Sequence, residues 1–401
     1  MRIPHTFNPL GKTPGAKHFE LVVKPGILAS TMTYGFTPYW NSGGYCSVDW
    51  GDGQKEDATI SGTKLNHTYA VAGTYAIRID ADCYQVGFAG WDSYPIVVSC
   101  SGDWNKLGNL TSGYLMFYHC TNMQINCTSL PEGMTRGDTM FNSCTNAQLP
   151  LTKLPDELKG YVGYMFYGCT KATLPLTSLP DGVKYGEYMF FKCLNAELPL
   201  TKLSDSLTDG YHMFYGCTKA TLPLTSLPNG LTNGGCMFCL CKTAKFSFVS
   251  LPESLTNGSS MFDSCVKAEL PLTKLPDALT NGDNMFSGCG NAQLPLTSLP
   301  DGLTTASGMF YVCRKAEIKL TKLPSELTNC FRMFQYCTNA EINLDTLVAN
   351  ASEEGWTKLT DITNMFNNCP KVTGSRSAFL AKCPANVVGA DTAFLGTNTT
   401  E

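Results

Sequence analysis

Cysteine is the residue whose number and spacing in this chain could do chemistry. The 401-residue sequence holds 19 cysteines, and eleven of them follow a Met-Phe pair in the pattern M-F-x-x-C. Stacked strands lie about 4.8 Å apart, whereas the Cβ atoms of a disulfide lie about 3.5–4.5 Å apart. We therefore expect each repeat cysteine to be a small buried hydrophobic residue. The eleven are Cys120, Cys144, Cys169, Cys193, Cys217, Cys241, Cys265, Cys289, Cys313, Cys337 and Cys369.

Metal binding has one local candidate, the segment CMFCLC with Cys236 and Cys239 in a C-x-x-C spacing. A closed zinc site needs four ligands, and no second cysteine pair or histidine stands at a suitable spacing nearby. We expect no metal and no cofactor. Three further cysteines, Cys46, Cys83 and Cys100, lie outside the repeated pattern, and whether they include one disulfide stays open.

Catalysis would need a convergent set of polar side chains. Asp49 and Asp52 could form a carboxylate pair or bind calcium, but an Asp beside Gly in a turn commonly caps its own backbone. The five histidines belong to no Ser-His-Asp, G-x-S-x-G, P-loop or H-E-x-x-H pattern. We expect no catalytic residues and no enzyme activity.

The Met-Phe pairs recur every 24 residues, with one step of 25 and a last step of 32. A fixed period of this size predicts a solenoid, in which each unit buries its apolar face only against its neighbours. Within a unit, the segment LPLTSLP predicts a very short strand and M-F-x-x-C an irregular, 3₁₀-like return. The sixteen residues MFYGCTKATLPLTSLP occur at 165–180 and again at 213–228, which indicates duplication of a 48-residue pair of coils.

Lysines in the coils support stacking in register. At the position after L-P-L-T and at the position before the repeat Ala, no two lysines fall in consecutive coils. Like charges directly opposite each other on adjacent strands are destabilising, so stacking selects such an alternation.

Residues 19–100 lack the M-F-x-x-C pattern and contain several short alternating segments between turn signals. These segments predict a small β-sandwich. Here W-G-D-G at 50–53 and H-T-Y-A-x-x-G-T-Y at 67–75 resemble the polycystic-kidney-disease (PKD) type domain, although one residue and a Phe are missing after Trp50. The resemblance implies an Ig-like sandwich that serves extracellular proteins as a spacer or contact module.

The coil pattern L-P-x-x-L-T-x-G-x-x-M-F-x-x-C-x-x-A-x-L-P-L resembles the BspA-like class of leucine-rich repeat over about residues 105–370. It departs in having Met before Phe and usually no Ile before the Gly. This resemblance implies a surface protein that binds host proteins or other cells, and it supplies no catalytic residue. The expected organisation is an extended arm at 1–18, the PKD-like sandwich at 19–100, an all-β solenoid of about eleven coils at 101–375 and a cap at 376–401.

Ligand binding is expected at positions flanking Met-Phe, where the first five coils are rich in aromatic residues. Exposed aromatic strips suit flat sugar faces or a protein partner. The alternative is that these rings only cover the core. The candidates are Tyr114, Tyr118, Tyr161, Tyr164, Tyr167, Tyr185, Tyr188, Phe191, Tyr211 and Tyr215.

Composition limits the partners. The net charge is −4, which gives no basic footprint for nucleic acid, and no stretch of 18 apolar residues could insert in a membrane. The N-terminal segment lacks the apolar core of a signal peptide. We expect an extracellular adhesion or recognition protein, on a virion or on a bacterial surface, that binds a protein or glycan of a host or neighbouring cell. A phage host-recognition protein would belong to a virion and bind a bacterial surface, so it combines the two settings. The alternative is a structural virion decoration or fibre component, docked on other virion proteins through residues 1–18.

Overall fold

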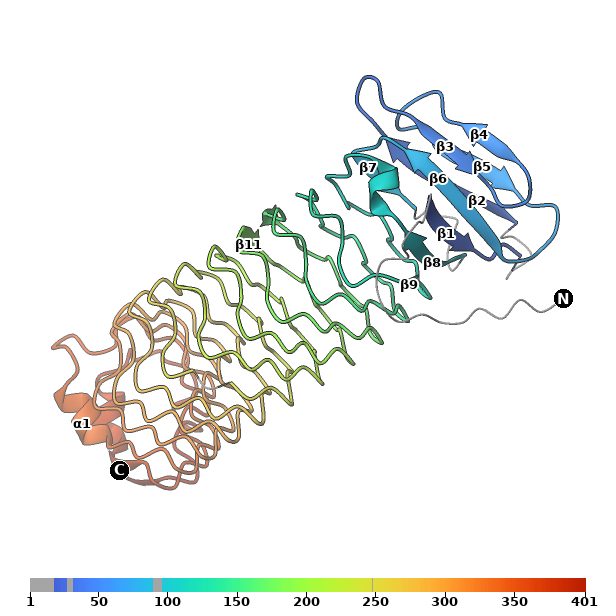
Figure 1. The fold of residues 1–401 in the computed structure, drawn as a ribbon. Coiled ribbons are helices and arrows are strands. Elements are labelled where there is room, and N and C mark those ends of the chain that lie inside the picture. The colour runs from blue at the N-terminus through green and yellow to red at the C-terminus, as the bar shows by residue number, and fades with distance from the viewer. Residues whose placement is uncertain (1–17, 27–31, 89–95, 247) are drawn as a thin grey trace. The chain divides into compact units, whose positions relative to one another are not determined.

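The computed structural model describes residues 18–26, 32–88, 96–246 and 248–401, so the expected arm lies almost wholly outside the described residues. The chain divides into two compact units, residues 1–182 and 183–401. Short strands and turns dominate both units, and helix is scarce (Figure 1).

The first unit opens with an N-terminal module of eight strands and a 3₁₀ turn. One sheet has the order β4-β3-β6-β1-β8 and is extended by β9 (Gln124–Ile125) of the first coils, and the other has the order β5-β2-β7. The strands are β1 (Phe19–Val23), β2 (Thr33–Tyr39), β3 (Cys46–Asp49), β4 (Lys55–Asp57), β5 (Leu65–Thr68), β6 (Tyr75–Ala81), β7 (Gln85–Gly87) and β8 (Val97–Gly102), with η1 at Trp104–Leu107.

Aromatic residues form the centre of this module. Phe19, Phe36, Trp50 and Phe88 are at most 1% exposed. Phe88 stacks on Phe19 at 5.4 Å between ring centroids and contacts Phe36 at 5.7 Å. Alternation along β1, where every second residue is buried, supplies the apolar face that such a core needs.

The N-terminal module continues directly into the first coils. Strand β8 pairs in parallel with β9 (Gln124–Ile125), which already belongs to the repeat. Phe88 donates its N–H to the carbonyl of Met116 at 2.8 Å, as Phe117 does to Met140 at 2.9 Å. Phe88 therefore takes the place of a repeat phenylalanine ahead of the first Met-Phe pair, which the sequence pattern did not predict.

In the second unit the coils stack in register through parallel bridges, one residue per coil (Figure 1). Asn233, for example, is bridged to Asp209 on one side and Asn257 on the other. The side-chain amide of Asn257 donates to Asn233 Oδ1 at 2.9 Å, so the side chains extend the backbone ladder. Two short strands also occur along the coils, β10 (Gly160–Tyr161) in the first unit and β11 (Val183–Tyr185) in the second.

The strand expected at LPLTSLP is not there, and this prediction was wrong. Most bridges fall instead on the middle residue of the T-N-G segment, four residues before Met. In four coils the first leucine of L-P-L has a positive φ, between 41° and 43°, which interrupts a strand. These are Leu198, Leu222, Leu270 and Leu294. Both leucines are nevertheless buried, so the alternation itself was interpreted correctly.

The core of each unit is a row of phenylalanines, one from each coil. Within the second unit, Phe190 and Phe214 stack at 5.3 Å with 4° between their planes, and the row continues to Phe366. The repeat cysteines lie behind this row. In most coils the thiol donates to the phenylalanine carbonyl of the preceding coil, as from Cys217 to Phe190 at 3.0 Å. All cysteines in the chain are free thiols.

The C-terminal residues add one more turn of the array. Phe394 stacks on Phe366 at 5.8 Å, and Phe366 donates its N–H to Ala393. Around it lie α1 (Leu344–Ala349), α2 (Arg376–Leu380) and the parallel strands β12 (Thr373–Ser375) and β13 (Asn398–Thr400). Within the described residues no helix is long enough to cross a membrane, since α1 has six residues and α2 five.

Candidate functional site

The residues that flank Met-Phe have an unusual backbone. We name each coil by the number of its methionine, and count positions −2 and −1 before Met and +1 and +2 after Phe. In all eleven coils the residues at −1 and +2 are left-handed, with φ between 51° and 71°. Each coil thus reverses direction on both sides of its buried Met-Phe pair, and in coils 189, 213 and 261 the side chains at −2, −1 and +1 are half-buried at the surface.

In the first unit the predicted aromatic residues contact cationic and aromatic neighbours. The guanidinium of Arg136 lies 4.0 Å above the ring of Tyr114 and is held by Asp138 at 2.6 Å. Tyr164 and Tyr167 pack at 5.6 Å between centroids. Tyr161 is 43% exposed. Tyr118 is half-buried and packs on its neighbour His119 at 4.2 Å.

In the second unit the predicted residues come together. Coils 189 and 213 place side chains next to one another at positions −2, −1 and +1. We call these six residues the aromatic block: Glu187, Tyr188, Phe191, Tyr211, His212 and Tyr215. Tyr185, 36% exposed, stands outside the block with Lys184 5.2 Å above its ring.

His212 is the centre of the aromatic block. Its ring stacks on Tyr188 at 4.9 Å and on Tyr215 at 5.2 Å, and it meets Tyr211 at 4.2 Å. Phe191 stacks on Tyr215 at 4.9 Å. All of these side chains are half-buried, so part of each remains accessible to a ligand.

Two polar side chains of the block lack partners for a buried atom. Glu187 Oε2 and His212 Nδ1 are buried and make no hydrogen bond to another described atom of the protein. Burial lowers the pKa of His212, so its neutral form is favoured. Burial also raises the pKa of Glu187, and the nearby Asp209 adds to this rise, while the residue's own backbone N–H opposes it. The sequence pattern had not marked Glu187 or His212, although their positions −2 and −1 could have identified them.

Coil 237, next to the block, carries Gly235, Cys236 and Cys239 at the same three positions. Cys239 lies 3.8 Å from a carboxylate oxygen of Asp263, and burial raises its pKa to about 12, so it stays a protonated thiol. No group of three or more metal-ligating side chains occurs in the part of the chain that the structure describes.

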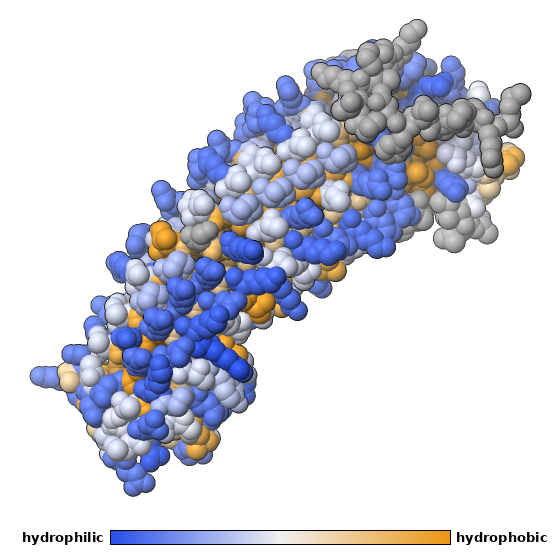
Figure 2. Space-filling view, turned by 60° about the horizontal axis from the view of Figure 1, so that its bottom comes forward, coloured by the Kyte–Doolittle hydropathy of each residue, from blue (hydrophilic) through white to orange (hydrophobic). Residues whose placement is uncertain are grey.

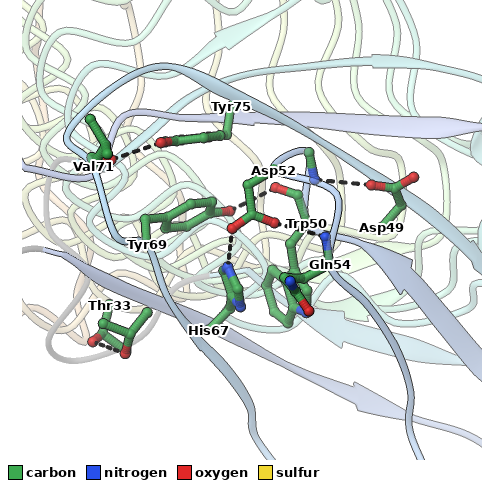
Figure 3. A network of polar contacts seen from close by, with 11 residues as sticks. Thr33, Asp49, Trp50, Asp52, Gln54, His67, Tyr69, Val71 and Tyr75 are labelled. Atoms are coloured by element: carbon green, nitrogen blue, oxygen red, sulfur yellow. Dashed lines mark hydrogen bonds and ion pairs between the residues drawn. The ribbon is translucent and has the colours of Figure 1, made fainter.

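Asp49 and Asp52 of the N-terminal module cap their own turn (Figure 3). Asp49 accepts from the N–H of Gly51, and Asp52 accepts from the N–H of Gln54, both at 3.0 Å. Asp52 also contacts His67 Nε2 at 2.8 Å. Desolvation raises the pKa of Asp52, but the hydrogen bonds from Gln54 and His67 outweigh it, so the pKa lies below its usual value.

The rest of that motif is also accounted for by packing. His67 stacks on Trp50 at 5.0 Å, and the hydroxyl of Tyr69 donates to the Trp50 carbonyl at 3.0 Å (Figure 3). Tyr75 stacks on Tyr69 at 4.2 Å. The W-G-D-G and H-T-Y segments therefore hold each other through ring stacking and hydrogen bonds.

Other surface features are weaker candidates. On the face shown in Figure 2, hydrophobic side chains surface as small patches among hydrophilic ones. A shallow hollow of about 270 Å³ lies between Lys274 and Lys322, but these lysines pair with Asp277 at 2.9 Å and Asp301 at 3.0 Å. Its charges are already neutralised within the protein.

Comparison with known proteins identifies the repeat. Residues 113–221 and 210–341 match the family described as BspA type leucine-rich repeat region, in six copies. These overlapping segments cover more than half of the chain and include every predicted ligand-binding residue, whereas the N-terminal module lies outside them. No curated protein and no solved structure matches the chain. The chain therefore belongs to the BspA-type leucine-rich repeat family.

Proposed function

We propose that this chain is a non-enzymatic recognition protein that binds a cell-surface protein or glycan through the aromatic block. Proteins with BspA-type repeats are typically surface or extracellular proteins of adhesion and recognition, and the family is generally non-enzymatic. In this proposal the stacked coils form a solenoid that presents the block as a rigid surface.

One observation carries the proposal: the aromatic side chains of the block are not needed to cover the core. Coil 261 has Ser259, Ser260 and Asp263 at the same three positions, yet its Met261 and Phe262 are fully buried. The Met-Phe pair of a coil is therefore buried with small polar residues at these positions as well. Five half-buried rings that pack on one another in two successive coils then favour a binding role, because aromatic residues supply large contact area at low entropic cost.

The proposal also covers the N-terminal module, the C-terminal cap and the location of the protein. We propose that residues 19–100 form a PKD-like, Ig-like sandwich that spaces or orients the repeats, with a cap at 376–401. The mutual packing of the W-G-D-G and H-T-Y segments supports this resemblance. The protein would act outside the cell, on a virion or a bacterial surface.

The test is a glycan array together with whole-cell binding. The block variant combines Tyr211→Ser, His212→Ser and Tyr215→Asp, which copies coil 261 and should keep the fold. Tyr311→Ser is the matched control, because Tyr311 occupies position +1 in coil 309, where coil 285 has Ser287. We expect the intact chain and the control to bind and the block variant to lose binding. Equal binding by all three, or none by any, would contradict the proposal, and the second result would favour a structural role.

A further inference from the structure

The aromatic block contains two of the three buried side-chain atoms without a hydrogen-bond partner among the described residues. These are Glu187 Oε2 and His212 Nδ1, and the third, Gln335 Oε1, belongs to coil 333. A buried polar atom without a partner is costly and uncommon, so each such atom needs a reason. Two of them in adjacent coils, within the surface proposed to bind a ligand, point to a ligand that satisfies them.

Both atoms are suited to accept a hydrogen bond. A carboxylate oxygen is an acceptor, and Nδ1 of a neutral histidine accepts when Nε2 carries the proton. Burial lowers the pKa of His212 and so favours this neutral ring. The ligand that fits would therefore bring hydroxyl or N–H donors to its rim and an apolar face to the rings.

A cationic ligand fits less well, although aromatic residues beside carboxylates can bind ammonium groups. The protein already places its own cations there. Lys192 lies 5.2 Å above the ring of Phe191, and Lys184 takes the same distance over the neighbouring Tyr185. These lysines would repel an incoming cation.

We propose that the aromatic block is a saccharide site, in which the rings of Tyr188, Phe191, Tyr211 and Tyr215 pack against the C–H face of a sugar and Glu187 and His212 accept hydrogen bonds from its hydroxyls. The ligand class is a neutral, hydroxyl-rich saccharide on a cell or particle surface. This inference rests on the proposed function and narrows its ligand from protein or glycan to glycan.

The first experiment uses cells to which the intact chain binds. One sample is treated with periodate, which cleaves vicinal diols of sugars, and a matched sample with a protease. We expect periodate to abolish binding and protease to leave it. The reverse result, with the block variant still defective, would overturn the saccharide inference and leave the recognition function standing. Undiminished binding by the block variant would overturn both.

The second experiment tests the two acceptors on oligosaccharides bound in the glycan array. His212→Phe keeps an aromatic ring in the stack but removes Nδ1, and Glu187→Ser copies position −2 of coils 261 and 309. Each should weaken saccharide affinity about tenfold, as expected for one lost hydrogen bond, with a thermal midpoint no lower than that of the parent. The control is Gln335→Asn, which alters the third unpartnered side chain and copies Asn367 of coil 365. Unchanged affinity in both block variants, or an equal loss in the control, would overturn the assignment of these acceptors.

Discussion

The thiol of Cys265 donates a hydrogen bond to the carbonyl oxygen of Phe238 at 3.0 Å, across two successive coils. Both residues are fully buried, and the N–H of Phe238 donates to the carbonyl of Met261. The repeat cysteine therefore has a definite role, as the donor for a buried carbonyl that the coil spacing leaves beside it. Burial also raises the pKa of Cys265 well above its usual value, so the thiol stays protonated and can donate this hydrogen bond.

We predict that Cys265→Ala destabilises the protein by about 2–4 kcal/mol, because it removes packing and leaves a buried carbonyl without a donor. Cys265→Ser keeps a donor and should cost less. Urea unfolding of the full chain, followed by tryptophan fluorescence and by circular dichroism, measures the difference. Equal losses in the two variants would show that packing alone selects cysteine.

A second prediction concerns the pair Asp52 and His67. Asp52→Ala removes both the turn cap and the contact with His67, so it should destabilise the N-terminal module by about 1–3 kcal/mol. The control is Lys55→Ala, which breaks a 3.5 Å ion pair with Asp49 whose lysine is 73% exposed, and it should cost less than about 1 kcal/mol. A smaller loss for Asp52→Ala than for the control would contradict the role of the pair.

The same pair should make the stability of the N-terminal module depend on pH in the acid range. Because the pKa of Asp52 is lowered in the fold, its contribution to stability is present above the ordinary aspartate pKa of about 3.9. That contribution is lost as the pH falls through the lower pKa of the folded state. Asp52→Ala should therefore differ most from the parent near neutral pH and least in strong acid, as measured by thermal melting. A constant difference across this range would refute the linkage.

A third prediction uses position +2, where coils 285 and 309 have Gly288 and Val312 with nearly the same φ, 68° and 60°. A left-handed backbone disfavours β-branched residues by about 1–2 kcal/mol. Gly288→Val should therefore destabilise the array by about that amount. Val312→Gly should relieve this strain but lose some packing of the half-buried valine. We therefore expect it to stabilise the array by at most about 1 kcal/mol. Equilibrium unfolding tests both, and a shift of the same sign in the two variants would disprove the argument.

How much of this could be predicted from the sequence depends on whether side chains or backbone decide the feature. The period, the buried Met-Phe pairs and the burial of the repeat cysteines follow from residue type and spacing. The location of the bridges does not, because nothing in the sequence L-P-L marks Leu198 or Leu270 as left-handed. The sequence pattern also missed Phe88, since the residues around it lack the M-F-x-x-C spacing.

The candidate site was likewise predictable only where residue type and repeat position decide it. Aromatic residue types at fixed positions of the repeat are enough to single out Tyr188, Phe191, Tyr211 and Tyr215 as candidates. Stacking in register then decides which of the ten candidates share a surface. The unpartnered atoms of Glu187 and His212 could not be predicted, because the absence of a hydrogen bond depends on every neighbour within a few ångströms.

The last prediction follows from His212. Burial lowers its pKa in the fold, so the unfolded chain binds a proton near the ordinary histidine pKa of about 6.5 while the folded chain does not. As the pH falls from about 7.5 through 6.5, the unfolded state binds more protons, and the stability of the parent decreases on account of this group. His212→Phe lacks this proton uptake, so its stability should rise relative to the parent over the same interval.

Thermal melting of the two proteins side by side, from about pH 7.5 to about pH 5.5, measures this relative stability. Tyr311→Ser serves as the control, because it changes a surface ring but no group that titrates in this range, and its difference from the parent should stay constant. A difference between His212→Phe and the parent that is also constant would mean that His212 accepts its proton equally well in the folded and unfolded chains. Protonation would then not be disfavoured by the block, and a neutral acceptor at Nδ1 would lose its electrostatic support.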